Sequence, residues 1–160
     1  MDDDATRWLD DEEQRTWRSF LAANRLFFEH IERQLQQDAG LPHAYFEILV
    51  RLSEAPDRRL RMSELATNAM SSRSRLSHAI ARMEEAGWVR RRACPTDKRG
   101  QFAELTEAGF ERVDSAARGH VEEVRTFLFD VLTPDQQRAL REISDAITDS
   151  LGDRPGDGAP

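Results

Sequence analysis

Two long stretches of the chain repeat apolar residues at helical spacing. From about Glu12 to Asp38 no Pro or Gly interrupts the pattern, whose large apolar residues are Trp17, Phe20, Leu21, Phe27, Phe28, Ile31 and Leu35. After Thr106, apolar residues step by three or four positions from Phe110 to Val131. Residues three and four apart share one face of an α-helix, so both stretches are predicted to be long amphipathic helices. A small domain cannot cover such long apolar stripes alone, and we expect part of them to pack against a second copy of the chain.

Shorter helices are predicted between and after these two stretches. Pro42 suits the first turn of a helix that runs up to Ala55, and a short helix is predicted from Met62 to about Asn68. Near the end, Thr133-Pro134-Asp135-Gln136 has the residues of a capping box and opens a helix that runs to Leu151. Residues 152–160 consist largely of Gly, Pro and Asp, and we expect a disordered tail there.

The stretch from Ser71 to Met83 predicts a helix with two different faces. Leu76, Ala79, Ile80 and Met83 form one apolar stripe, and Ser71 or Ser72 supplies the N-cap. The other face carries hydroxyl, imidazole and guanidinium groups, at Arg73, Ser74, Arg75, Ser77, His78 and Arg82. No carboxylate lies on this face, so it is able to donate hydrogen bonds to base edges and phosphates. The alternative is an ordinary solvated helix face.

A β-hairpin is predicted after this helix. Gly87 suits the left-handed residue that ends a helix, residues 88–94 alternate towards a strand, residues 95–100 form a polar turn, and residues 101–105 return. A short strand near Arg61 is expected to pair with the hairpin. Two helices joined by a tight turn and followed by such a hairpin form a winged helix-turn-helix.

The distribution of charge supports a surface for nucleic acid. The net charge of the 160-residue chain is −7, but residues 51–100 contain 12 Lys+Arg and 6 Asp+Glu, and both flanking segments are acidic. A local positive field attracts a polyanion more than the total charge repels it. The basic segment coincides with the predicted winged helix, which makes double-stranded DNA the expected partner.

Several motifs, taken together and in order, resemble the MarR family of bacterial transcription regulators. They are Leu65-Ala66, Met83-Glu84, Gly87-Trp88-Val89-Arg90-Arg91, Asp97-Lys98-Arg99 and Leu105-Thr106-Glu107-Ala108-Gly109. The resemblance implies a mainly α protein with a small β-hairpin wing. It places a winged helix-turn-helix at residues 42–105 and a helical dimerisation region at residues 12–38 and 106–151, within one domain of residues 1–160.

The resemblance also implies a function: a sequence-specific DNA-binding regulator, and a homodimeric repressor of a pseudo-palindromic operator that a small-molecule effector releases. The two recognition helices of such a dimer enter successive major grooves about 34–36 Å apart. A monomer with a compact helical core is the alternative to the dimer. Alternatives to this function are an oxidation-sensing regulator acting through Cys94, and an architectural winged helix that binds DNA without sequence preference.

Expected DNA contacts lie on the two basic elements. The candidate DNA-binding residues are Ser72, Arg73, Ser74, Arg75, Ser77, His78, Arg82, Lys98 and Arg99. Arg99, at the end of the hairpin, is expected in the minor groove, where narrow A·T stretches attract arginine. The family resemblance gives Asp97 a role in holding neighbouring arginines by ion pairs, with Arg99 and Arg91 as its expected partners.

Aromatic residues supply a candidate effector pocket, which in the MarR family lies between the dimerisation arm and the winged helix. Its candidate residues are Trp17, Phe20, Phe27, His43, Tyr45 and Phe46, and core packing is the alternative explanation for them. His30, His43, His78 and His120 are too widely spaced to form a local metal motif, so we expect no metal.

The sequence gives little support to an enzyme or to a membrane protein. It contains no Gly-rich phosphate loop, nucleophile elbow or clear catalytic dyad, and we expect no catalytic site and no cofactor. No apolar run approaches the ~18–20 residues that span a bilayer. One cysteine and an acidic start without signal-peptide character favour a cytoplasmic protein.

Overall fold

The computed structural model describes residues 6–68, 73–94 and 97–152, without the side chains of Thr67, Asn68, Arg73, Asp97, Lys98 and Arg99. The chain forms two compact units, residues 1–120 and residues 121–160. In the described residues no helix is long and apolar enough to cross a membrane.

The first unit begins with helix α1 (Asp11–Ala39), the predicted long amphipathic helix. Asp10 is its N-cap: the carboxylate accepts hydrogen bonds from the backbone N–H groups of Glu12 and Glu13, and the Glu13 side chain accepts one from the N–H of Asp10. Gly40, with φ +55°, ends the helix in the left-handed conformation. The helix therefore begins at Asp11, one residue before the predicted start at about Glu12, and the capping box at Asp10 was not predicted.

The middle of the first unit is a winged helix-turn-helix, as predicted. It consists of α2 (His43–Glu54), the 3₁₀ turn η1 (Pro56–Arg58), strand β1 (Arg59–Arg61), α3 (Met62–Asn68) and α4 (Arg73–Glu85). Strands β2 (Val89–Cys94) and β3 (Asp97–Leu105) complete it. The core that joins these elements is fully buried and includes Leu49 of α2, Leu65 of α3 and Ile80 of α4.

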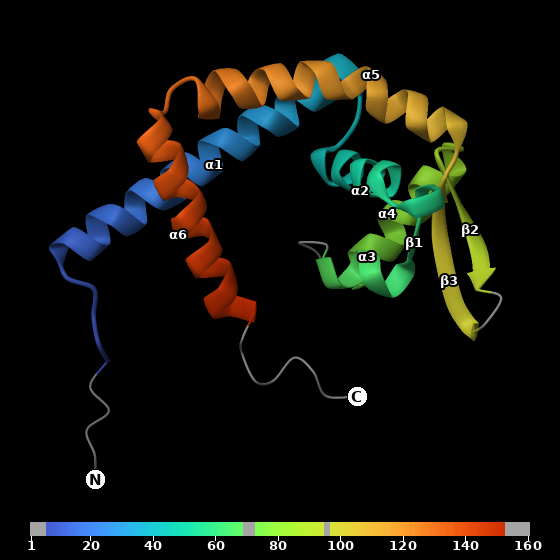
Figure 1. Ribbon diagram of the computed structural model, residues 1–160, viewed down its shortest axis with the longest axis horizontal. Helices are drawn as coiled ribbons and strands as arrows, with labels where there is room; N and C mark the ends of the chain where they lie inside the picture. The colour runs from blue at the N-terminus through green and yellow to red at the C-terminus, as the bar shows by residue number, and fades with distance from the viewer. Residues whose placement is uncertain (1–5, 69–72, 95–96, 153–160) are drawn as a thin grey trace, which may run out of the picture. The chain divides into compact units, whose positions relative to one another are not determined.

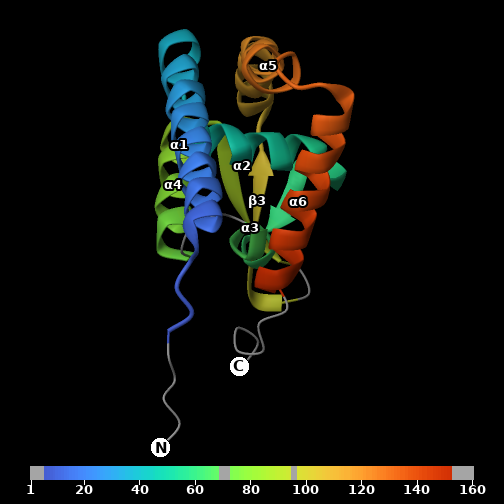
Figure 2. The same ribbon diagram turned by 90° about the vertical axis from the view of Figure 1, so that its left-hand side faces the viewer.

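The three strands form one antiparallel sheet in the order β1-β3-β2. β1 pairs with β3 as predicted, with Arg61 opposite Phe102, and Arg92 of β2 lies opposite Phe102 from the other side. Ala103 of β3 is buried, because α2, α3 and α4 cover that face of the sheet. Figures 1 and 2 show these helices on one side of β3.

The hairpin differs from the prediction in its turn. Residues 95–100 were expected to be a polar turn, but β3 already begins at Asp97, which pairs with Cys94. The register shifts between Ala93 and Cys94, so several residues of β3 lie opposite one step of β2. Strand β3 therefore begins within the segment that was predicted to be the turn of the hairpin.

Helix α5 (Glu107–Val124) begins where Thr106 caps it, as predicted, by accepting a hydrogen bond from the N–H of Gly109 at 3.0 Å. Arg58 ties this end of α5 to η1: its guanidinium contacts the carboxylate of Glu107 at 3.0 Å and stacks 3.8 Å over the Phe110 ring. The beginning of α5 is thus fastened to the winged helix.

The second unit contains the end of α5, the π-helical turn η2 (Arg125–Phe129) and helix α6 (Pro134–Gly152). The predicted capping box is present: Thr133 N–H donates to Gln136 Oε1 at 2.9 Å, and Gln136 N–H donates to Thr133 Oγ1 at 3.3 Å. The apolar edge of α6 is solvent-exposed, at Leu140, Ile143, Ile147 and Leu151. The tail predicted to be disordered lies outside the described residues, apart from Gly152.

Candidate nucleic-acid interface

Helix α4 separates its apolar and polar residues onto opposite faces. Leu76, Ala79, Ile80 and Met83 are buried in the core of the winged helix. Between Ser74 and Met83 the exposed residues are Ser74, Arg75, Ser77, His78 and Arg82, all of them candidates from the sequence. Burial of one stripe fixes the rotation of the helix about its axis, and this rotation presents the other stripe to solvent. Ser72 and the side chain of Arg73 lie outside the described part of the chain.

An ion pair closes the C-terminal end of this polar face. Arg82 Nη1 contacts Glu85 Oε2 at 3.1 Å, and both side chains are mostly exposed. Such a pair contributes little to stability, so Arg82 is able to exchange Glu85 for another anion. The polar face itself carries no carboxylate between Ser74 and Arg82.

Arg91 of β2 connects the hairpin to α4. Its backbone N–H donates to Glu84 Oε1 at 3.0 Å, its Nη2 donates to the carbonyl of Ser77 at 3.2 Å, and its Nη1 lies 3.8 Å from Glu84 Oε2. Arg91 therefore reaches the carbonyl of a residue in the middle of the polar face. Asp97, the partner predicted for Arg91 from the sequence, has a side chain that lies outside the described residues.

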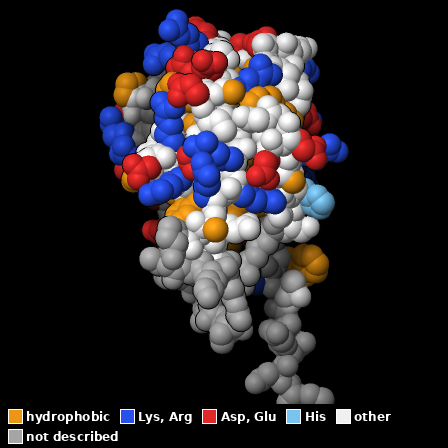
Figure 3. Space-filling model, turned by 90° about the vertical axis from the view of Figure 1, so that its right-hand side faces the viewer, with side chains coloured by type: hydrophobic (Ala, Val, Ile, Leu, Met, Phe, Trp, Pro, Cys, Tyr) orange, Lys and Arg blue, Asp and Glu red, His pale blue; other side chains and the backbone are white. Residues whose placement is uncertain are grey.

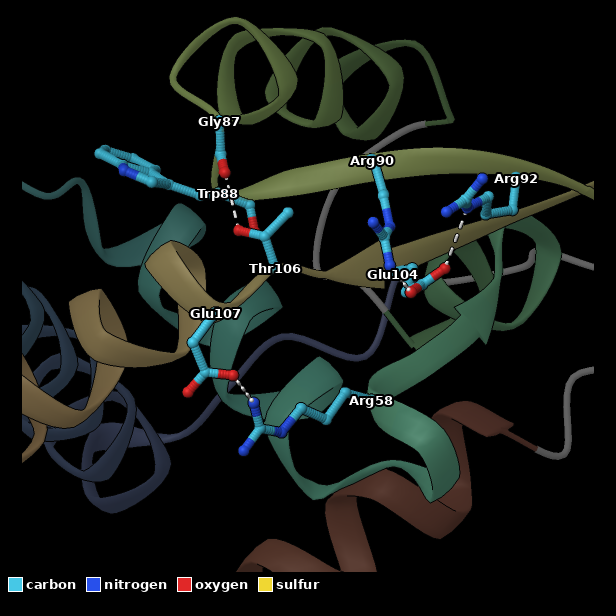
Figure 4. A network of polar contacts seen from close by, with 8 residues as sticks. All are labelled: Arg58, Gly87, Trp88, Arg90, Arg92, Glu104, Thr106 and Glu107. Carbon is cyan, nitrogen blue, oxygen red and sulfur yellow. Dashed lines mark hydrogen bonds and ion pairs between the residues drawn. The ribbon is translucent and has the colours of Figure 1, made fainter.

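The turn between α4 and β2 is held by the beginning of α5 (Figure 4). Gly87, with φ +76°, ends α4 as predicted. The Thr106 hydroxyl donates to the carbonyl of Gly87 at 2.7 Å, and the N–H of Thr106 donates to the carbonyl of Trp88 at 3.0 Å. Gly109 packs so closely against Trp88 that a Cβ atom there would lie 2.1 Å from the carbonyl oxygen of Trp88. The orientation of α4 is therefore tied to α5.

The face of the sheet turned away from the helices is basic, which the sequence analysis missed. Its arginines are Arg59, Arg61, Arg90 and Arg92. Glu104 binds Arg90 and Arg92 (Figure 4), and the hydrogen bond from Arg90, with smaller help from Arg92, holds the pKa of Glu104 below its ordinary value. Figure 3, which views the hairpin side of the molecule, shows Lys and Arg side chains interspersed with acidic ones. The signal in the sequence was the spacing of two residues between Arg59 and Arg61 and between Arg90 and Arg92, which places each pair on one face of a strand.

The aromatic candidates for an effector pocket divide into separate groups. Trp17 and Phe20 stack on each other at 6.1 Å between ring centroids, and both are about half exposed. Phe27 contacts Phe28 edge-on at 5.7 Å. The half-buried Tyr45 has no ring contact with these among the aromatic pairs of the described residues.

His43 and Phe46 form a third group, together with His120, which the sequence analysis did not select. The His120 ring lies 4.6 Å from Phe46 and 6.1 Å from His43, and His43 lies 5.8 Å from Phe28. Burial, with help from the charge of His43, lowers the pKa of His120. The Nδ1 atom of His120 is buried without a hydrogen-bond partner. Sequence spacing cannot reveal this group, because α2 and α5 are distant in the chain.

Cys94 and the histidines show no sign of redox or metal chemistry. Cys94 is buried, whereas reactive cysteines are accessible to their oxidants, so its burial disfavours oxidation sensing. Among the described residues, no three His, Cys, Asp or Glu side chains are grouped so that they could hold a metal ion.

Comparisons with known proteins agree with this arrangement. The sequence model of the MarR family matches residues 41–100. Among solved structures, the chain is similar to Sco3205, a MarR family transcriptional regulator from Streptomyces coelicolor in complex with DNA; the two are 54% identical, the match covers 96% of each chain, and the TM-score is 0.91.

Two named regulators match over shorter stretches. The transcriptional regulator HosA of Escherichia coli O111:H- is 30% identical over 100 residues, which are 62% of this chain and 72% of HosA. The regulator PecS of Dickeya dadantii is 33% identical over 72 residues, so this match spans 45% of the chain and only 41% of PecS.

The match to the structure of Sco3205 confirms the predicted fold class, a mainly helical protein with a winged helix. Members of the family are transcriptional regulators and not enzymes, which confirms the expectation that this protein is not an enzyme. The chain, with a winged helix whose α4 presents a polar face to solvent, belongs to the MarR family of transcriptional regulators.

Proposed function

We propose that the protein is a sequence-specific DNA-binding repressor that acts as a homodimer. The observation that carries this proposal is the division of α4 into a buried apolar stripe and an exposed stripe of hydroxyl, imidazole and guanidinium groups. A helix of this kind fits the major groove of B-DNA, about 12 Å wide, and donates hydrogen bonds to base edges. The likeness to Sco3205, which binds DNA in its crystal structure, supports the same partner.

Each candidate side chain has a role in this complex. Ser74, Ser77, His78 and Arg82 contact bases in the major groove, and Arg73 and Arg75 contact phosphate or guanine. Arg91, through its bond to the Ser77 carbonyl, holds the hairpin against α4. At the end of the hairpin, Arg99 enters the minor groove, Lys98 contacts a phosphate and Asp97 positions neighbouring arginines.

A second copy of the chain is the partner of the exposed apolar residues. On α1, Trp17, Phe20 and Leu21 are about half exposed, and α6 exposes Ile143 and Leu151 more fully. Large exposed apolar surfaces mark protein interfaces, and residues 12–38 and 106–151 carry them here. Two-fold symmetry then places the two α4 helices in successive major grooves, and the operator is a pseudo-palindrome.

Repression follows from occupation of the promoter, and release follows from a small aromatic effector. The group formed by His43, Phe46 and His120 joins α2 of the winged helix to α5, so a ligand bound there acts on both. A ligand that binds more tightly when the two α4 helices of the dimer stand at one particular separation shifts the dimer towards that separation. Trp17, Phe20, Phe27 and Tyr45, the other candidates from the sequence, have no ring contact with His43, Phe46 or His120 among the aromatic pairs of the described residues, and we leave them out of this pocket.

Selection of operators from random DNA, followed by mobility-shift titration, tests this function. We expect a two-fold symmetric sequence, bound by one dimer. Arg75→Ala should weaken binding at least tenfold, whereas Arg118→Ala on the exposed surface of α5 should leave it unchanged. Binding with a steep salt dependence but no preference among sequences would instead support the architectural alternative.

A further inference from the structure

The outer face of the sheet gathers guanidinium groups from both edges onto one surface. On β3, Ala103 and Leu105 are buried beneath the helices, and Phe102 and Glu104 alternate with them on the opposite face. Arg61 of β1 and Arg92 of β2 lie opposite Phe102 in the strand register, one from each side. Neither α4 nor the candidate effector groups use this face.

Phe102 and Glu104 hold these arginines in place without covering them. The Cζ atoms of Arg59 and Arg61 lie 5.5 and 5.4 Å from the centre of the Phe102 ring, and Arg92 Nε lies 3.3 Å from Glu104 Oε2. The Arg92 side chain remains 57% exposed. Guanidinium groups held in this way lose less conformational freedom when they bind an anion.

These side chains line a shallow hollow that is rich in positive charge. Its volume is about 310 Å³, and its charged residues are Arg59, Arg61, Arg92 and Glu104. Asp57 contacts Arg59 at 3.1 Å, outside the hollow, and Glu104 is shared between Arg92 and Arg90. The outer face of the sheet therefore carries more positive than negative charge, which suits a polyanion.

The strand register fixes how far Arg61 and Arg92 lie from the end of the hairpin. The pair of Cys94 and Asp97 is the last that the structure describes, two residues beyond Arg92 along β2. At about 3.3 Å per residue, Arg92 lies about 7 Å behind that pair. The minor groove of B-DNA is about 7.5 Å deep, so a hairpin whose Cys94–Asp97 pair lies at the floor of the groove brings Arg92 to the level of the phosphates at its rim.

We propose that Arg61 and Arg92 bind the phosphodiester backbone on the wall of the minor groove that faces away from α4. The inference rests on the proposed entry of the hairpin into the minor groove. Glu104 lies two residues further from the end of the hairpin, so the backbone of its strand neighbours Arg59 and Arg90 lies about 7 Å further from the DNA than that of Arg61 and Arg92. The hairpin is thus held from both sides, by the contacts of α4 and by this phosphate contact.

The salt dependence of operator binding tests the phosphate contact. Arg61→Gln with Arg92→Gln removes four cations per dimer, and Arg33→Gln with Arg118→Gln, on exposed positions of α1 and α5, is the matched control. Each neutralised phosphate contributes about 0.9 to the slope of log affinity against log salt. We expect the slope to fall by roughly 3.6, and the advantage of wild type over the variant to shrink about 10²-fold between 50 and 200 mM salt. The control variant should keep the wild-type slope.

A second experiment uses the wild-type protein and a modified duplex. Neutral methylphosphonate linkages replace the phosphates of the outer wall of the minor groove. They should weaken binding by wild type and add nothing to the loss caused by Arg61→Gln with Arg92→Gln, since a shared contact cannot be lost twice. Additive losses, or a variant with the wild-type slope, would overturn the phosphate contact. Failure of wild type to prefer any operator would instead overturn the proposed function, so the two failures are distinguishable.

Discussion

Gly109, in the first turn of α5, packs closely against Trp88 in the turn that follows α4. A Cβ atom there would lie 2.1 and 2.9 Å from the carbonyl oxygen and carbon of Trp88, and 2.7 Å from Leu105 Cδ1. Two of these neighbours are backbone atoms, which cannot turn aside as a flexible side chain does. We therefore expect Gly109→Ala to force the first turn of α5 away from the turn between α4 and β2.

The magnitude follows from three contributions. Overpacking costs about 1–3 kcal/mol, and the displaced turn weakens the hydrogen bonds of Thr106, each of which contributes about 1 kcal/mol. Against this, Ala is favoured over Gly within a helix by about 1 kcal/mol. The balance is a loss of about 2–3 kcal/mol in the free energy of unfolding, which lowers the melting temperature by roughly 4–12 °C for a chain of this size.

Thermal denaturation followed by circular dichroism measures this loss, and Gly119→Ala is the matched control. Gly119 lies in the same helix, and a Cβ atom there would lie 3.1 Å from the side-chain Nε2 of Gln34, a longer approach than at Gly109 and one to a side chain instead of the backbone. The control gains the same helical preference and should stay within about 1 kcal/mol of wild type. The reasoning fails if Gly109→Ala melts at the wild-type temperature, or if both variants fall equally.

Three further predictions follow from the same contacts and surfaces. Thr106→Val keeps the shape of the side chain but leaves the Gly109 N–H without its partner, so urea titration should show a loss of about 1–3 kcal/mol; an unchanged midpoint would contradict this. Burial lowers the pKa of His120 below its ordinary value of 6.5, so the folded state binds this proton less readily than the unfolded chain. Its contribution to stability is complete above pH 6.5 and declines as the pH falls towards the folded pKa. His120→Gln should flatten that decline in melting curves taken from about pH 6.5 to 5, and an unaltered decline would assign it to other groups. Ile143→Asp, on the exposed edge of α6, should convert the dimer to monomer in sedimentation equilibrium, and a dimer of wild-type strength would rule out this interface.

Local signals in the sequence determined the helices, several of their ends and the hairpin. Periodic apolar residues located α1, α4 and α5. A left-handed glycine marked the end of α4 at Gly87, and hydroxyl side chains that accept from nearby backbone marked the helix starts at Thr106 and Thr133. The cap at Asp10 was missed because four consecutive acidic residues offer several equivalent N-caps. The early start of β3 was missed because backbone pairing does not require alternating side chains.

The sequence by itself also determined the polar face of α4, since the residues of one helix share a face through spacing alone. Only the tertiary structure decided which residues from distant segments meet. The register of β1 and β2 on β3 places Arg61 and Arg92 beside Phe102, and the packing of α5 brings His120 to His43. The physical reason is that spacing along the chain reports the orientation of side chains within one element. The register and packing between elements instead depend on the combined burial of many residues, which no short stretch of sequence contains.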